Sequence, residues 1–291
     1  MAAPAWQTLA RPCLSFLLPA GSNAFIAALG RQIEAQAGER PEVEARVEMI
    51  EGFNPESLAR RLDAVPAGCD GLGLVALDHP LVREGLRRLS QRGVKVVTLA
   101  SDVLHVPRVA YVGIDNRQAG RLAGYLLGRF LAGRDAPKVA FFAGSRSYRG
   151  HEEREMGFRS VLAEDFRHVA IVAQGESMDD PDRAEAETRA VLEVHPDLSA
   201  IYNAGAGIPG IARALRERGL AGHVVLIGHE ATERNKRLLL DGVLDAVIDQ
   251  NPRVAAREAL NALTRAARGG ALRAGAAAPA GRVPREPAGG L

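Results

Sequence analysis

Several kinds of residue are scarce in this chain, and each shortage excludes a class of protein. Only two cysteines, Cys13 and Cys69, occur among the 291 residues, which is too few for a disulfide-stabilised scaffold. The sequence has no C-x-x-C pair and no H-E-x-x-H spacing, so it contains no recognisable metal site. Of the 37 basic residues only three are lysines, and the arginines are scattered. With a net charge of +2, the chain has no basic stripe that could follow a nucleic-acid backbone.

Long apolar runs are also missing. None approaches the roughly 20 apolar residues that a membrane-spanning helix requires. Residues 1–21 contain a single basic residue, Arg11, and no apolar core followed by a small-residue cleavage site, so they do not match an export signal. These absences predict a cytoplasmic chain with no membrane partner.

The residues that are present describe a soluble globular protein, with 47% hydrophobic and 25% charged residues and a length that suits two domains. Short apolar runs rich in β-branched residues alternate with segments that repeat apolar residues at helical spacing. Strands are predicted at 12–18, 43–50, 71–76, 94–99, 108–114, 138–142, 168–173, 198–202, 223–227 and 242–248. Helices are predicted at 24–36, 55–65, 80–91, 117–132, 152–163, 181–194, 208–218, 232–240 and 252–268.

This alternation predicts an α/β fold in which helices connect parallel strands. Ten strands are too many for one small domain, and a helix-free loop at 101–107 marks the break between two sheets. The predicted fold class is therefore two doubly wound parallel-sheet subdomains joined by crossover strands. Residues 269–291 are rich in Ala, Gly, Pro and Arg, which predicts a flexible tail.

Seven of the apolar runs lead into polar or charged residues. The carboxyl ends of parallel strands line the ligand crevice of α/β proteins, so we expect these residues to converge on one small site. They are Ser22-Asn23, Ser101-Asp102, Asp115-Asn116, Asn203, His229-Glu230, Asp249-Gln250 and a loop that ends near Arg154.

One glycine pattern leaves an enzymatic alternative open. Gly205, Gly207 and Gly210 form G-x-G-x-x-G between a predicted strand and helix, and Glu230 follows about 20 residues later, as in dinucleotide-binding motifs. The pattern lies after the eighth predicted strand rather than in the first βαβ unit, and a tight turn explains the glycines without a nucleotide. His229 has no serine or cysteine nucleophile in a recognisable elbow. We therefore predict a binding protein without a cofactor, and keep an NAD-dependent enzyme as the lesser alternative.

Five segments together resemble the LacI family of bacterial regulators and the related periplasmic sugar-binding proteins. They are FLLPAGSNAFIAAL, VVTLASD, VAYVGIDNRQAGRLAGYLLGRFLAG, REMGF and VVLIGHEATERNKRLLLDGVLDAVIDQNPRVAAREAL. The resemblance runs from about Pro12 to Arg268. It implies an N-terminal subdomain of residues 1–115 plus 251–268, a C-terminal subdomain of residues 116–250, and a ligand in the cleft between them. The family's third crossover would fall inside the tail.

The resemblance and the strand-end positions together give a set of expected ligand-binding residues. Polar members would hydrogen-bond hydroxyl groups, the arginine would supply charge-assisted donors, and the phenylalanine would form an apolar wall. The set is Asn23, Phe25, Ser101, Asp102, Asn116, Arg154, Asn203, Glu230 and Gln250.

Three positions depart from the family pattern. Glu230 stands where the family usually has Asp, so the carboxylate is kept with one more methylene. The usual Asp after the fourth strand is Ala100, and an acid appears two places on, at Asp102. Where the family usually has Asn-Asp after the eighth strand, residues 204–205 of this chain are Ala-Gly, and Asn203 comes just before them.

No helix-turn-helix headpiece precedes the first predicted strand, and no export signal is recognisable. We therefore expect the effector-binding core of a LacI-family regulator, which closes on a sugar, polyol or sugar acid. It would act on operator DNA only through a headpiece absent from this chain, and the resemblance implies a homodimer. A periplasmic sugar-binding receptor of a transporter is the alternative.

Overall fold

The computed structural model describes residues 11–269 and contains all ten predicted strands and all nine predicted helices there, with ends that differ by a few residues. The strands are β1 (Cys13–Ala20), β2 (Glu44–Glu51), β3 (Gly71–Leu74), β4 (Lys95–Leu99), β5 (Ala110–Val112), β6 (Lys138–Ala143), β7 (Ala170–Glu176), β8 (Leu198–Asn203), β9 (Val225–His229) and β10 (Ala246–Ile248). The helices are α1 (Ala24–Gly38), α2 (Pro55–Asp63), α3 (Pro80–Gln91), α4 (Asn116–Phe130), α5 (Arg149–Asp165), α6 (Pro181–Val194), α7 (Ile208–Glu217), α8 (Glu233–Leu240) and α9 (Pro252–Ala267).

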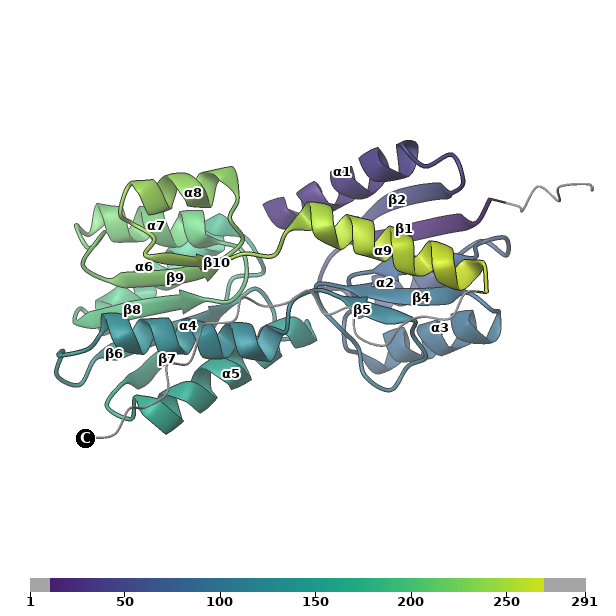
Figure 1. The fold of residues 1–291 in the computed structure, drawn as a ribbon. Helices are drawn as coiled ribbons and strands as arrows, with labels where there is room; N and C mark the ends of the chain where they lie inside the picture. Colours follow the sequence, from purple (N-terminus) through teal and green to yellow (C-terminus); the bar gives the residue numbers. More distant parts are fainter. Residues whose placement is uncertain (1–10, 270–291) are drawn as a thin grey trace, which may run out of the picture.

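The strands form two parallel sheets of five, in the orders β2-β1-β3-β4-β5 and β10-β9-β8-β6-β7, which confirms the predicted fold class. We call the first sheet with α1–α3 and α9 the N-lobe, and the second sheet with α4–α8 the C-lobe. The chain passes between them at residues 113–115 and 249–251, and α9 then packs beside α1 on the N-lobe (Figure 1). The prediction that the loop at 101–107 marks the break was wrong, because this loop joins β4 to β5 within the first sheet. The predicted tail and third crossover lie outside the described residues, apart from Gly269.

Helices near the cleft begin at polar residues that come shortly after strands. Asn23 caps α1 by accepting hydrogen bonds at Oδ1 from the amides of Phe25 (3.1 Å) and Ile26 (3.3 Å). Asp115 caps α4 in the same way through the amide of Gln118 (2.9 Å). A capping side chain is held in one orientation, so the loop that carries it is fixed at the mouth of the cleft.

Glycines let α4 and α5 approach closely. A Cβ atom at Gly120 would lie 1.9 Å from the main-chain oxygen of Arg154, and one at Gly157 would lie 2.0 Å from that of Arg117. Only hydrogen fits at these two positions. The close packing fixes the position of α5 against α4, and with it the position of the Arg154 side chain at the cleft.

Replacing Gly120 with alanine should therefore push α5 away from α4. We expect Gly120→Ala to lower the free energy of unfolding by about 1–3 kcal/mol, the usual cost of overpacking, as measured by urea denaturation. Gly38→Ala at the end of α1 is the matched control, since nothing lies within 4 Å of its new Cβ atom. Equal stability of the Gly120→Ala and Gly38→Ala variants would show that the close approach of α4 and α5 does not exist.

Candidate functional site

A small pocket lies between the lobes, at the carboxyl ends of both sheets. Its volume is about 50 Å³, which holds a few water molecules and no sugar, so the lobes are closed on each other. Its lining residues are Pro19, Asn23, Phe25, Ile26, Val75, Ala100 and Ser101 of the N-lobe, Tyr148, Gly150, His151, Arg154, Asp179, Gly205, Ala206 and Glu230 of the C-lobe, and Gln250 between them.

Six of the nine residues expected to bind ligand line this interlobe pocket. They are Asn23, Phe25, Ser101, Arg154, Glu230 and Gln250. These residues are far apart in the sequence, and the two sheets bring them together because every strand presents its carboxyl end to the same gap. The remaining three, Asp102, Asn116 and Asn203, lie outside the lining.

Asp102 and Asn203 are engaged within the protein. Asp102 accepts hydrogen bonds from Thr98 Oγ1 (2.7 Å) and from Arg108 Nη2 (2.6 Å), which turns its carboxylate along the N-lobe. Asn203 is fully buried, and its Nδ2 donates to the carbonyl oxygens of Gly205 (2.8 Å) and Ala206 (3.1 Å). Asn203 therefore shapes the loop after β8, and that loop in turn lines the pocket.

Arg154 is the only arginine or lysine that lines the pocket, and 4% of its surface is exposed. Its Nε donates to Asn116 Oδ1 (2.8 Å) and its Nη1 to the carbonyl oxygen of Ala204 (2.6 Å). Asn116 is held in turn, because its Nδ2 donates to the hydroxyl oxygen of Tyr111 (3.0 Å). Among residues 11–269 no carboxylate forms an ion pair with Arg154, so a buried cation with five N–H donors is held by two neutral acceptors.

Glu230 follows β9 in a left-handed backbone conformation (φ 69°) and is 8% exposed. Its Oε1 accepts a hydrogen bond from Gln250 Nε2 (2.7 Å), while its buried Oε2 has no hydrogen-bond partner within the described residues. Burial raises the pKa of Glu230 to about 8, although the charge of Arg154 and the hydrogen bond from Gln250 oppose the shift. At neutral pH the carboxyl group is therefore mainly protonated and can donate as well as accept a hydrogen bond.

His151, which lines the pocket, and the buried His229 are uncharged at neutral pH. Burial lowers the pKa of His151, whose Nδ1 lies 3.1 Å from the amide nitrogen of Ser145. Burial also lowers the pKa of His229 well below its usual value, and its Nε2 lies 2.8 Å from the Tyr202 hydroxyl oxygen. The charges that face the pocket at neutral pH are thus mainly those of Arg154 and Asp179.

Sequence reasoning missed two C-lobe residues that reach the N-lobe. Tyr148 packs edge-on against Phe53, with 5.4 Å between ring centroids, and lies within the N-lobe core. Asp179 hydrogen-bonds to Asn23 across the gap (2.8 Å). Asp179 escaped notice because the predicted strand ended at residue 173, whereas β7 continues to Glu176. With the correct end, Asp179 would have joined the other strand-end polar residues.

Each glycine of the G-x-G-x-x-G pattern has a structural reason, so a nucleotide site is not needed to explain the pattern. Gly207 has φ +105° at the N-terminus of α7. A Cβ atom at Gly210 would lie 1.7 Å from the Pro181 carbonyl oxygen, and one at Gly205 would lie 2.4 Å from the Gly144 amide nitrogen. The glycines allow two loops and two helices to pack closely.

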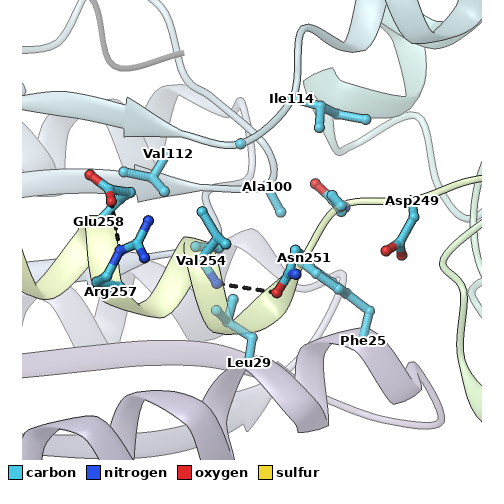
Figure 2. Close-up of a pocket in the computed structure, with 13 residues that line it drawn as sticks. Phe25, Leu29, Ala100, Val112, Ile114, Asp249, Asn251, Val254, Arg257 and Glu258 are labelled. Carbon is cyan, nitrogen blue, oxygen red and sulfur yellow. Dashed lines mark hydrogen bonds and ion pairs between the residues drawn. The ribbon is translucent and has the colours of Figure 1, made fainter. Parts of the chain in front are cut away.

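A larger hollow of about 480 Å³ lies beside the crossovers and shares Phe25, Ala100 and Gln250 with the interlobe pocket (Figure 2). Its walls are mainly apolar. Asn251 caps α9 through the Val254 amide (3.2 Å), and Arg257 pairs with its neighbour Glu258 (3.0 Å). These polar groups are already engaged, so the hydrogen-bonding chemistry suited to a hydroxylated ligand lies in the interlobe pocket.

The family described as "Periplasmic binding protein domain" matches residues 14–271. The chain belongs to this family. It is 26% identical over 193 residues to a D-ribose/D-allose-binding protein of Pseudomonas aeruginosa and 27% identical over 202 residues to the ribose import binding protein RbsB of Salmonella typhimurium. The alignments cover 64% and 68% of this chain, but span only 59% and 66% of those two relatives.

Among solved structures, the fold matches GanP, a glucose-galactose binding protein from Geobacillus stearothermophilus, with a TM-score of 0.81 and 25% identity. The match covers 90% of this chain and 93% of that one. Membership in a family of binding proteins confirms the prediction that the chain is not an enzyme.

These relatives correct the expectations that depended on the regulator reading. The family is described as a periplasmic binding protein domain, and the two named relatives are a sugar-binding protein and a ribose import binding protein, which contradicts a LacI-family regulator core. The same finding contradicts a cytoplasmic location, operator DNA as a partner and a homodimer of regulator cores. The regulator reading failed because the resemblance covered regulators and receptors alike, and the choice between them depended on the N-terminal residues alone. Across residues 11–269, every helix is too short or too polar to cross a bilayer.

The raised pKa of Glu230 makes stability depend on pH. The pKa of the Glu230 carboxyl group is about 8 in the folded chain and 4.5 in the unfolded chain. Its contribution to the free energy of unfolding is therefore fully present below pH 4.5 and is lost as the pH rises through 8. We expect the unfolding free energy of the wild type to fall relative to Glu230→Gln, by at most about 1.4 kcal/mol per pH unit between these values. Urea denaturation from pH 5 to 8.5 measures it, with the exposed Glu233→Gln as control. A constant difference between wild type and Glu230→Gln would contradict the assignment.

Proposed function

We propose that this chain is a sugar-binding receptor that closes its two lobes on a small hydroxylated ligand and serves an import system. One observation carries the proposal: polar side chains from distant segments meet between the lobes with hydrogen-bonding capacity left over. Within the protein, Arg154 donates one hydrogen bond from Nε and one from Nη1. Glu230 Oε2 has no hydrogen-bond partner within the described residues. A ligand with several hydroxyl groups can satisfy both.

The energetics favour a ligand that touches both lobes. A neutral hydrogen bond contributes about 0.5–1.5 kcal/mol and one to a charged group about 1.5–3 kcal/mol, so a few such contacts supply useful affinity. The pocket of about 50 Å³ must widen to admit a sugar, and residues 113–115 and 249–251 are the segments about which the lobes can open. Ligand bound to Asn23 on one lobe and Arg154 on the other would then favour closure.

The names of the relatives narrow the ligand class. They refer to ribose, allose, glucose and galactose, all uncharged sugars. The pocket agrees with an uncharged ligand, because Arg154 and Asp179 carry opposite charges and Glu230 is largely protonated at neutral pH.

Isothermal titration with D-ribose, D-allose, D-glucose and D-galactose tests the proposal. We expect at least one to bind, and a sugar at 100 times its Kd to stabilise the fold by about 2.7 kcal/mol. Arg154→Lys should weaken that binding at least tenfold, because lysine lacks the planar fork that spans Asn116 and the ligand. Arg159→Lys is the control, since Arg159 lies on the same helix, pairs with Glu155 (2.8 Å) and does not line the pocket. Binding that is equally strong in the Arg154→Lys variant would contradict the site.

A further inference from the structure

Asp179 bridges the two lobes and is 8% exposed. Its carboxylate accepts a hydrogen bond at Oδ2 from Asn23 Nδ2 (2.8 Å) and at Oδ1 from the Ala206 amide (2.8 Å). Its main-chain oxygen accepts another from Ser22 Oγ (2.6 Å). The loop that follows β7 is thus tied to the loop that follows β1 by two hydrogen bonds.

Two glycines make room for this carboxylate. A Cβ atom at Gly144 would lie 2.2 Å from Asp179 Oδ1, and one at Gly205 would lie 2.8 Å from it. With larger residues at the ends of β6 and β8, the carboxylate could not rest against the Ala206 amide. The position of Asp179 in the pocket wall is therefore determined by the surrounding backbone.

The orientation of the Asn23 amide is fixed as well. Its Oδ1 accepts from the Phe25 and Ile26 amides at the start of α1, so Nδ2 is the end that faces Asp179. A hydrogen-bond donor on the N-lobe thus opposes an acceptor on the C-lobe. A sugar cannot enter the present volume of about 50 Å³ unless this pair separates, and both groups then need new partners.

A hydroxyl group is the ligand group that suits both walls. Its oxygen accepts from Asn23 Nδ2, and its hydrogen donates to Asp179 Oδ2. A carboxylate or phosphate can accept from Asn23 but brings negative charge against Asp179. An ammonium group can donate to Asp179 but leaves the Asn23 amide without an acceptor.

We propose that Asp179 is a specificity-determining residue, which together with Asn23 reads one hydroxyl group of an uncharged sugar and rejects the corresponding sugar acid. This inference rests on the proposed function and adds a residue and a rule of selection to it. Asp179 supplies a negative charge to the same pocket that holds the positive charge of Arg154.

The test titrates D-ribose, its carboxylate D-ribonate and the monodeoxy analogues of D-ribose into the wild type and Asp179→Asn. Asparagine has the same shape as aspartate, but its amide NH₂ group is a donor. Whichever way the amide turns, this NH₂ group faces another donor, either Asn23 Nδ2 or the Ala206 amide. We expect Asp179→Asn to bind D-ribose roughly tenfold to a hundredfold more weakly, the usual effect of losing a hydrogen bond to a charged group. Asp182→Asn removes the same charge from an exposed position of α6 and should bind like the wild type.

The analogues separate reading of a hydroxyl from a general loss of structure. One deoxy analogue should bind the wild type at least tenfold more weakly than D-ribose binds the wild type. The same analogue should bind the Asp179→Asn variant as strongly as D-ribose binds that variant. D-Ribonate should bind the wild type at least tenfold more weakly than D-ribose, and this preference should shrink in Asp179→Asn. Asn23→Ser provides a second route, because serine keeps the cap of α1 while removing Nδ2, and it should lose the response to the same hydroxyl.

Two failures can be told apart. If the wild type binds an uncharged sugar and Asp179→Asn binds it equally well or more tightly, Asp179 does not read the ligand and this inference is overturned alone. If the wild type binds none of the four uncharged sugars tested above, the proposed function is overturned and this inference falls with it. If every deoxy analogue loses the same affinity in wild type and variant, the hydroxyl rule is wrong.

Discussion

Arg154 carries a full positive charge at a place where solvent reaches 4% of its surface. Burying a charge is costly unless it is paired, and here the partners within the described residues are an amide oxygen of Asn116 and a main-chain carbonyl oxygen. The arrangement requires α5 to lie almost against α4, which the glycines at 120 and 157 permit. It also requires the carboxyl ends of both sheets to face one gap. Most of the site follows from these two requirements.

The neighbours of Arg154 keep the pocket close to electrical neutrality. Asp179 supplies one negative charge, Glu230 is shifted by burial toward its protonated form, and His151 and His229 are uncharged. Such a pocket offers many donors and acceptors but little net charge, which suits a hydroxylated ligand and not an anion. The proposed ligands are accordingly uncharged sugars and polyols, without the sugar acids that the sequence alone left open.

Much of the fold could be predicted from the sequence because parallel strands and amphipathic helices have different periods, and because capping residues such as Asn23 and Asp115 mark where helices begin. The polar residues after strands also located five of the six expected residues that line the pocket, and the family resemblance supplied the sixth, Phe25. The sequence could not show that Asp102 turns toward Arg108, since that depends on which side chain is closer in space. It also could not show that Tyr148 crosses to the other lobe, because a tyrosine in a loop has no periodic signature.

The crystal structure of this chain with its tightest-binding uncharged sugar is the most direct test of the account. We predict density for the sugar between the lobes, in contact with Arg154 and Glu230 from the C-lobe and Asn23 from the N-lobe. Sugar bound instead in the apolar hollow of Figure 2, with the interlobe pocket still closed at its present volume, would contradict the central claim.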